Sequence, residues 1–280
     1  ADADSVNISG ALYGSTIDFG AGDEVFTLSV KATDTTIAGG SGADTFVVTT
    51  AAAVTASRFE GGAGNDSFSI ADTLSNSSVR GDAGSDVMVF TSTVSASSIS
   101  GGSGRDTLQF AALVHATTID AGADNDTLIF SAGENYSDTT VSGGAGADSI
   151  KFVSAASNVH ASTDAGADSI TFGGALTSST IDGGGGNQTI VFSSGADDVQ
   201  FGGSFGGGNI SLGAGTDTIS FVGAKLAGTT ITGVDDDDTL TFSLISEITA
   251  VFGGAIGAGA QVSFGEGKDM ATFSGAISAA

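Results

Sequence analysis

The stretch Gly39-Gly40-Ser41-Gly42-Ala43-Asp44-Thr45-Phe46-Val47-Val48 has the form G-G-x-G-x-D-x-h-x-h, where h is an apolar residue. The same form returns at residues 61–70, 101–110 and 143–152. A pattern that recurs at this spacing is typical of solenoid proteins, which grow by stacking similar coils. The repeat therefore decides the architecture before any single element is considered.

The aspartate of the pattern marks one acidic position in each repeat, and most steps between these positions are 20 to 22 residues long. Longer steps of 29 and 31 residues precede Asp217 and Asp269. We expect one coil to contain about 20 residues. The positions are Asp4, Glu24, Asp44, Asp66, Asp86, Asp106, Asp126, Asp148, Asp168, Gln188, Asp217, Asp238 and Asp269.

Apolar residues stand two and four residues after each acidic position, as Phe46 and Val48 follow Asp44. Another stands seven residues before it, as Ile37 does. Alternating apolar residues indicate strands with one buried face. We predict two strands in each coil, separated by an Ala/Ser/Thr-rich distal loop on one side and by the Gly-rich turn on the other. Stacking then gives an all-β, right-handed parallel β-solenoid with coils about 4.8 Å apart.

The solenoid is predicted to occupy residues 1–280 as one domain, with irregular insertions near 193–208 and 243–260. We place the two extra residues of each 22-residue repeat in its distal loop. The absence of proline agrees with this reading, because internal strands need every backbone N–H for pairing.

The composition is acidic, with 32 Asp and Glu against 7 Lys and Arg and a net charge of -25. Nucleic acid is therefore excluded as a partner, since phosphate binding needs a basic surface. The hydrophobic content of 40% excludes a disordered acidic tail, and the lack of cysteine excludes disulfides and thiolate metal sites. No apolar run predicts a transmembrane segment. The acidic N-terminal sequence lacks a signal-peptide pattern, so we expect processing, another secretion route, or a longer parent protein.

Stacked coils would place the acidic residues in a column, with neighbouring carboxylates about 5 Å apart. Such carboxylates repel each other by about 1 kcal/mol even in bulk water, and Lys and Arg are too few to neutralise them. Calcium prefers carboxylate and carbonyl oxygens, and glycines allow consecutive carbonyls to turn toward an ion. A single Gly-Asp turn is equally well explained as a plain β-turn. The stacked column favours calcium.

The repeated turn resembles the RTX, or haemolysin-type, calcium-binding repeat, and the resemblance covers nearly the whole chain. It implies that each calcium ion lies between the turns of adjacent coils, held by aspartates of both turns and by glycine carbonyls. The resemblance is to members with calcium turns on one side, such as surface-layer and adhesin solenoids, so it implies several ions in one row. The best-matching pairs of turns are Asp44 with Asp66, Asp66 with Asp86, Asp86 with Asp106, and Asp148 with Asp168.

Departures from the repeat add to these candidate ligands or weaken them. Gln188 removes a charge, Asp124 and Asp236 occupy glycine positions, and Asp82 and Asp164 stand four residues before a key aspartate. The predicted calcium ligands are the carboxylates of Glu24, Asp44, Asp66, Asp82, Asp86, Asp106, Asp124, Asp126, Asp148, Asp164, Asp168, Asp217, Asp236, Asp238 and Asp269, with the carbonyls of Gly40, Gly42, Gly62, Gly64, Gly102, Gly104, Gly144 and Gly146.

Catalysis is not expected, because metalloprotease and P-loop motifs are absent and the two histidines, His115 and His160, occupy different places in their coils. We predict a secreted or cell-surface structural protein: a subunit of a surface layer or of a filament stacked end to end. The alternative is an adhesin stalk or a ligand-binding segment, with cell-surface carbohydrate as one possible partner. Ice is another ligand, because Ser/Thr pairs such as Thr35-Thr36 recur eight and nine residues before the acidic position.

Overall fold

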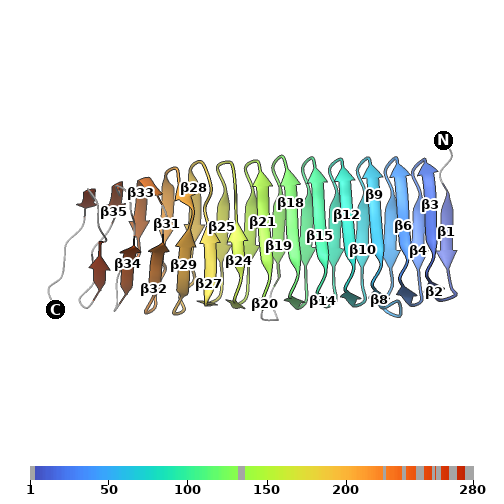
Figure 1. Ribbon diagram of the computed structural model, residues 1–280, viewed down its shortest axis with the longest axis horizontal. Helices are drawn as coiled ribbons and strands as arrows, with labels where there is room; N and C mark the ends of the chain where they lie inside the picture. The colour runs from blue at the N-terminus through green and yellow to red at the C-terminus, as the bar shows by residue number, and fades with distance from the viewer. Residues whose placement is uncertain are drawn as a thin grey trace. The chain divides into compact units, whose positions relative to one another are not determined.

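The computed structural model describes residues 4–131, 136–222, 225–234, 238–243, 249–253, 256, 260–264 and 270–274. The chain divides into two compact units, residues 1–142 and 143–280. Within each unit the described strands pair in parallel with strands one coil away, which makes a right-handed parallel β-solenoid with about 20 residues per coil (Figure 1). The predicted fold class is confirmed.

In the first unit, three parallel sheets run along the stacked coils. Sheet A contains β1 (Ser5–Ile8), β4 (Val25–Leu28), β7 (Thr45–Val48), β10 (Ser67–Ile70), β13 (Val87–Phe90), β16 (Thr107–Phe110) and β19 (Thr127–Phe130). Sheet B contains β2 (Leu12–Tyr13), β5 (Ala32–Thr33), β8 (Val54–Thr55), β11 (Leu74–Ser75), β14 (Val94–Ser95), β17 (Val114–His115) and β20 (Tyr136–Ser137). Sheet C contains β3 (Thr16–Ala21), β6 (Thr36–Ser41), β9 (Arg58–Ala63), β12 (Ser78–Ala83), β15 (Ser98–Ser103), β18 (Thr118–Ala123) and the start of β21 (Thr140–Ala145).

The second unit has strands of the same three kinds. Sheet A contains β22 (Ser149–Phe152), β25 (Ser169–Phe172), β28 (Gln188–Val191), β31 (Gly208–Ser211), β33 (Lys225–Thr232), β35 (Thr249–Phe252) and β37 (Met270–Phe273), and β30 (Ser204–Phe205) pairs with β33. Sheet B contains β23 (Ala156–Ser157) and β26 (Leu176–Thr177). Sheet C contains β24 (His160–Ser162), β27 (Ser179–Asp182), β29 (Asp198–Gly202), β32 (Thr218–Val222), β34 (Thr239–Ser243) and β36 (Gln261–Ser263).

The expectation of two sheets is corrected by sheet B, whose two-residue strands lie within the predicted distal loops. The two extra residues of one long repeat do fall there, between Val48 and Val54, where a turn is closed by the Ala52 N–H to the Thr49 carbonyl at 3.1 Å. The corresponding excess of the next long repeat lies between β19 and β20.

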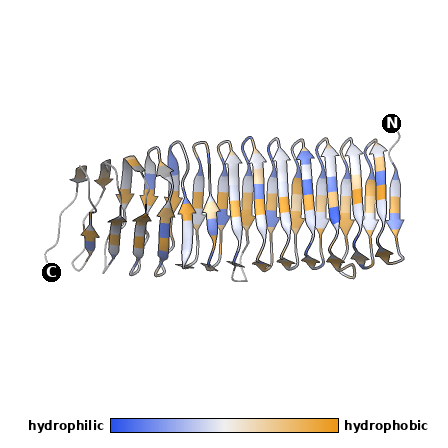
Figure 2. Cartoon of the chain, in the orientation of Figure 1, coloured by the Kyte–Doolittle hydropathy of each residue, from blue (hydrophilic) through white to orange (hydrophobic). Residues whose placement is uncertain are grey.

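The predicted inward positions fill the core, as the alternating hydropathy along the strands indicates (Figure 2). Identical residues stack on themselves from coil to coil. Phe90, Phe110 and Phe130 form one such row, with ring centroids 5.0 Å apart at each step and nearly parallel planes. Stacking a ring on its own copy fills the interior without any change of shape between coils, which is the condition for a regular solenoid.

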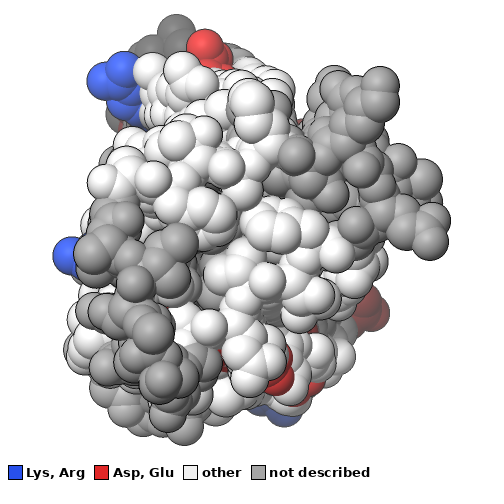
Figure 3. Space-filling view, turned by 90° about the vertical axis from the view of Figure 1, so that its left-hand side faces the viewer, with Lys and Arg blue, Asp and Glu red and all other residues white. Residues whose placement is uncertain are grey.

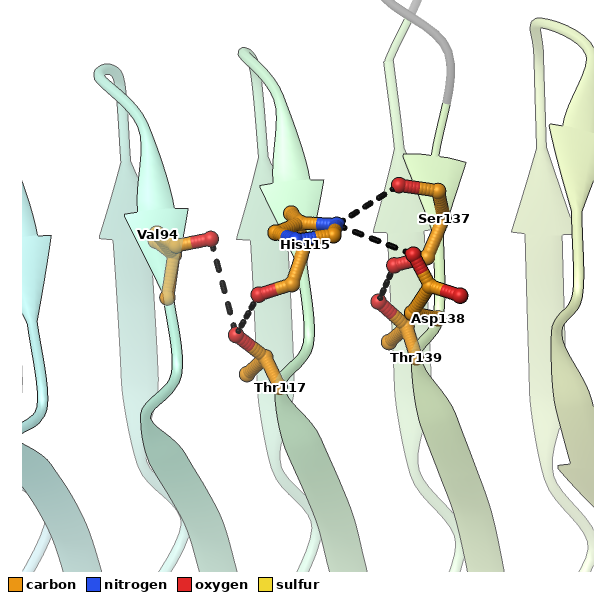
Figure 4. Close-up of polar contacts among 6 residues, drawn as sticks. All are labelled: Val94, His115, Thr117, Ser137, Asp138 and Thr139. Atoms are coloured by element: carbon orange, nitrogen blue, oxygen red, sulfur yellow. Dashed lines mark hydrogen bonds and ion pairs between the residues drawn. The ribbon is translucent and has the colours of Figure 1, made fainter.

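A buried row of hydroxyl groups lies after sheet B, beside a left-handed residue such as Asn76 with φ 49°. Ser77 Oγ donates to the Ser75 carbonyl at 2.8 Å and accepts from the Ser57 N–H at 3.0 Å. Thr117 and Thr139 make the same inward contacts, to the carbonyls of His115 and Ser137 (Figure 4). The Ser/Thr pairs therefore do not form an exposed double array, because the first member of the pair is buried from Thr35 to Thr139.

The region 193–208 is not an insertion. Gln188 pairs with Gly208 in sheet A, and Ser179 pairs with Val199 in sheet C, so the coil length of about 20 residues continues through it. The region near 243–260 lies partly outside the described residues, and its interpretation as an insertion stays a prediction.

The outer faces of sheets A and C differ in charge in the first unit. Outward residues of sheet A from β1 to β19 are all uncharged: Ser5, Asn7, Val25, Thr27, Thr45, Val47, Ser67, Ser69, Val87, Val89, Thr107, Gln109, Thr127 and Ile129. Outward residues of sheet C include Asp18, Arg58, Glu60, Arg80 and Asp120. Arg58 and Glu60 form an ion pair there.

Candidate metal centre

The key acidic residues lie where each Gly-rich turn enters sheet A, directly before the strand. In the first unit they form one buried column: Asp44 and Asp66 are 2% exposed, and Asp86 and Asp106 are 0% exposed. Parallel pairing of the following strands sets their register, as Thr45 pairs with Ser67 and Ser67 with Val87. The predicted column of stacked carboxylates is therefore present, and it faces inward, away from solvent.

Each carboxylate of the column binds the backbone of the coil before it. The N–H of Asp44 donates to Asp66 Oδ1 at 2.7 Å, and the N–H of Asp66 donates to Asp86 Oδ1 at 2.7 Å. The N–H of Asp86 donates to Asp106 Oδ1 at 2.7 Å in the same way. One oxygen of each carboxylate is thus satisfied by a short, charge-assisted hydrogen bond.

The second carboxylate oxygen of these residues is buried without a hydrogen-bond partner among the described residues. This holds for Oδ2 of Asp44, Asp66, Asp86 and Asp106, and for both carboxylate oxygens of Glu24. A buried polar atom without a partner is uncommon and costs on the order of 1–3 kcal/mol, more for a charged group. A row of such oxygens is the feature of this fold that most needs a ligand.

The first glycine of each turn makes room for this oxygen. A Cβ placed on Gly61 would overlap Asp66 Oδ2 and would lie 2.7 Å from the Gly81 carbonyl oxygen of the next coil. Gly39, Gly81 and Gly101 face the same kind of oxygen pair. These four glycines are therefore required by close approach, and a carboxylate oxygen and a backbone carbonyl converge beside each of them.

The second and fourth glycines of the turn serve the stacking itself. A Cβ on Gly62 would overlap the Gly40 carbonyl, and one on Gly64 would overlap the Gly42 carbonyl. The predicted carbonyl ligands Gly40, Gly42 and Gly102 thus face the turn of the next coil. The carbonyls of Gly61, Gly81 and Gly101, which meet the unpartnered oxygens beside the first glycines, were missed because the motif alone does not show where a carbonyl points.

Burial, together with the neighbouring carboxylates, raises the pKa of Asp66 and Asp106 to about 7, against the lowering effect of the backbone hydrogen bonds. Burial likewise raises the pKa of Asp86 to about 6. Near neutral pH it is therefore unfavourable to ionise every carboxylate of the column at once. A bound cation would make full ionisation favourable.

Gln188 shows what the column needs when a carboxylate is replaced. Its Oε1 accepts from the Asp168 N–H at 2.8 Å, as the aspartates do with their own preceding coil. Its amide nitrogen donates to the Gly166 carbonyl at 3.2 Å and to the Gly185 carbonyl at 3.1 Å. An amide donor thus occupies a place lined by two turn carbonyls, where a carboxylate would require a positively charged neighbour.

Asp217 and Asp238 are not in this column, so the prediction of a single row is wrong for them. They precede β32 and β34, which belong to sheet C, on the opposite side of the coil. In the first column the positions after Gln188 are Gly208 and Thr229. Asp197, which the sequence reasoning passed over as part of an insertion, is buried before β29 of sheet C.

The remaining predicted ligands fall into three groups. Asp126 and the turn that contains Gly104 in the first unit, and Asp148, Asp168 and the turn that contains Gly144 and Gly146 in the second, have the same placement, with each aspartate buried directly before a strand of sheet A. Asp82, Asp124 and Asp164 adopt positive φ in glycine positions and point toward the surface, where Asp82 lies 3.6 Å from Arg80. Asp236 and Asp269 lie outside the described residues.

Side chains alone do not form a metal cluster in the described part of the chain, where no three His, Asp or Glu side chains come together. Any cation in the column must therefore take backbone carbonyls among its ligands, as calcium commonly does. The face drawn in Figure 3 shows only scattered Asp and Glu on the described surface. Part of the negative charge of this chain belongs to carboxylates that are buried inside the coils.

The histidines do not converge on a catalytic site. His115 is exposed at the end of β17, and its Nδ1 lies 2.8 Å from Ser137 Oγ and 3.2 Å from Asp138 Oδ2 (Figure 4). Both contacts use the same ring nitrogen, so they do not have the arrangement of a nucleophile–base–acid triad, in which the two ring nitrogens act separately. His160 is exposed on sheet C. Both are surface residues.

Comparison with known proteins identifies a fold but no family. No family model and no curated protein matches this chain. One similar solved structure is a hyperactive, Ca2+-dependent, β-helical antifreeze protein from an Antarctic bacterium, with a TM-score of 0.52 and 22% sequence identity. The match covers 86% of this chain and 83% of that one. Among the described residues, no helix has the length and apolarity needed to cross a membrane.

Proposed function

We propose that this chain is a calcium-stabilised structural protein, in which calcium ions occupy the carboxylate column before sheet A. The observation that carries the proposal is the row of buried, unpartnered oxygens on Asp44, Asp66, Asp86 and Asp106. Hard divalent cations match these oxygens and the carbonyls beside them. The calcium dependence of the antifreeze structure with a similar fold supports this assignment.

The carboxylates of neighbouring coils and the turn carbonyls would hold the ions. In addition to the first-glycine carbonyls, the contacts of Gln188 indicate which carbonyls matter. The carbonyls of Gly64 and Ala83 precede Asp86 by the same 22 and 3 residues that separate Gly166 and Gly185 from Gln188. Bound calcium would supply the positive charge that lets adjacent carboxylates stay ionised inside the coil.

A structural role outside the cell fits these features best. Calcium at millimolar concentration is available there and would be too scarce in the cytosol for modest sites. The chain offers long parallel sheets and, among its described residues, no assembled catalytic group. We therefore infer a subunit of a surface layer or extracellular filament, with copies of itself or flanking solenoid segments as partners.

The test is to follow β-structure by circular dichroism and polymers by electron microscopy, first in chelator and then in millimolar calcium. The proposal expects β-structure to strengthen with calcium, and ordered polymers to form only then. Calcium-dependent folding without polymers would favour an adhesin segment. A fold unchanged by chelator would contradict the calcium assignment.

Ice binding is a second candidate, favoured by the outer face of sheet A in the first unit. That face is uncharged from β1 to β19 and repeats Thr, Ser and Val at the regular spacing of a parallel sheet. Charged side chains hold their own hydration water, so a face without them is better suited to ordered water. The similar fold of an antifreeze protein adds support.

This candidate is tested by thermal hysteresis of the calcium-loaded chain. Thr107→Lys on the sheet A face should abolish the effect, whereas Ser98→Lys on sheet C should preserve it. Absence of hysteresis in the unchanged protein would end this hypothesis and leave the structural role.

A further inference from the structure

The second unit contains a second carboxylate column on the opposite side of the coil. Asp197, Asp217 and Asp238 directly precede β29, β32 and β34 of sheet C, whereas Asp148 and Asp168 precede β22 and β25 of sheet A. Their stacking follows from strand register, since Val199 pairs with Ile219 and Ile219 with Leu240.

The second column repeats the contacts of the first. The N–H of Leu176 donates to Asp197 Oδ1 at 2.6 Å, and the N–H of Asp197 donates to Asp217 Oδ1 at 2.9 Å. The N–H of Asp217 donates to Asp238 Oδ1, also at 2.9 Å. The three aspartates are at most 2% exposed, and Asp197 Oδ2 is buried without a hydrogen-bond partner in the part of the chain that the structure describes.

The change of side takes place within one coil. Gln188 is the last residue of the first column whose side-chain oxygen accepts an N–H of the preceding coil, as the aspartates do. Asp197 follows nine residues later. Among the described residues sheet B ends at β26, and in the next coil the acidic turn lies between β28 and β29, where the preceding coil has the short strand β26. The first column continues with Gly208 and Thr229, which carry no carboxylate.

The stacked phenylalanines change sheets at the same place. Phe152, Phe172 and Phe192 stack in sheet A, with centroids 5.2 and 5.6 Å apart. Beyond them the stacked row is Phe201, Phe221 and Phe242 in sheet C, at 4.8 and 4.6 Å. The whole D-x-h-x-F unit therefore moves across the coil, so the move is a feature of the repeat and does not depend on one aspartate.

The turns of the second column also stack backbone on backbone. Gly213 has φ 89°, and a Cβ there would overlap the Ser193 carbonyl. Gly215 has φ 133°, and a Cβ there would lie 2.7 Å from the Gly195 carbonyl. The carbonyls of Gly195 and Ala214 precede Asp217 by the same 22 and 3 residues that separate the two carbonyls bound by the Gln188 amide from Gln188.

We propose that Asp197, Asp217 and Asp238 hold a second, separate row of calcium ions, so that the ion row changes sides of the solenoid at Gln188. This inference rests on the proposed calcium function and extends it to a second site. Gln188 then acts as an uncharged end to the first row, because its amide nitrogen already fills the carbonyl-lined place. Calcium ions would therefore lie beside sheet A before this coil and beside sheet C after it.

The test counts bound calcium per full-length chain by equilibrium dialysis. Asp197→Asn/Asp217→Asn should lose at least one ion relative to the unchanged chain, while the first row is retained. The matched control is Asp198→Asn, which removes the same charge from an exposed neighbouring position and should leave the count unchanged. Asp86→Asn reports on the first row and should lower the count independently.

The outcomes separate the two claims. If Asp86→Asn lowers the count and the double variant does not, the second row is refuted while calcium binding stands. If the unchanged chain binds no calcium, both claims fail. If the double variant loses its β-structure by circular dichroism, the count is taken on Asp197→Gln, which carries the side chain that the fold accommodates at residue 188. An unchanged count in that variant would also refute the second row.

Discussion

Replacing Asp86 by asparagine should change stability in opposite directions with and without calcium. Asp86 is fully buried, and its Oδ1 accepts the Asp66 N–H at 2.7 Å. Asparagine keeps that acceptor and places an amide N–H donor where the unpartnered Oδ2 was. This position lies beside Gly81, next to which the Gly101 carbonyl also lies. Gln188 shows that this fold satisfies an amide in such a place.

Without calcium, the magnitude follows from the carboxyl pKa. Burial raises the pKa of Asp86 from 3.8 to about 6, which corresponds to about 3 kcal/mol of destabilisation when the group is ionised. Asp86→Asn should therefore raise the free energy of unfolding in chelator by about 1–3 kcal/mol at pH 7.5, because the neutral amide removes all or part of this cost. With calcium at 100 times its Kd, each lost site removes about 2.7 kcal/mol. Asp86 is joined to both Asp66 and Asp106 and would face two sites, so the loss of about 5 kcal/mol exceeds the gain and the sign reverses.

Urea unfolding followed by circular dichroism, in chelator and in excess calcium, measures both effects. Asp120→Asn is the control, since it removes the same charge from an exposed position on sheet C and should change stability by less than about 0.5 kcal/mol in either condition. Equal destabilisation by Asp86→Asn in both conditions would refute the assignment of its second oxygen to calcium.

Three further predictions follow from the same contacts. In chelator, stability should fall as pH rises from about 4 to 7, because the folded pKa values of Asp66, Asp86 and Asp106 lie above the ordinary value for aspartate. In calcium, stability should rise over the same pH range. Thermal melts in chelator and at a fixed calcium concentration measure the two slopes. Gly61→Ala should lower stability by several kcal/mol and weaken calcium binding, because its Cβ would overlap Asp66 Oδ2, whereas Gly10→Ala has open space and should cost little in the same urea and calcium titrations. Ser97→Ala should cost about 1–3 kcal/mol by leaving the Ser77 N–H unpaired, and exposed Ser98→Ala should be nearly neutral in urea unfolding.

The sequence predicts most of the fold because each repeat carries the signals for the turn, the strands and the acidic position together. The acidic position, the apolar positions after it and the glycines before it recur together, so coil length, inward faces and the buried column before sheet A could all be derived. Sheet B could not, because a two-residue strand such as β8 (Val54–Thr55) is too short to show alternation. The buried hydroxyls were missed because serine and threonine are usual on exposed strands, and only the stacked geometry shows Ser77 turned inward.

The change of side was hidden because the D-x-h-x-F unit has the same form in either sheet. The 29-residue step from Gln188 to Asp217 contained the signal: Asp197 stands nine residues after Gln188 and 20 before Asp217. Nine residues is about half a coil, and half a coil leads to the opposite sheet. The orientation of the carboxylates was also beyond the motif, since it depends on which oxygen the preceding coil's N–H binds.

An anomalous difference map from crystals grown in calcium would show directly whether the carboxylate column binds the ion. We expect a row of calcium peaks about 2.3–2.6 Å from Oδ2 of Asp66, Asp86 and Asp106, with turn carbonyls completing each site. A well-ordered column without such peaks, at a calcium concentration that changes neither stability nor β-structure, would contradict the calcium assignment.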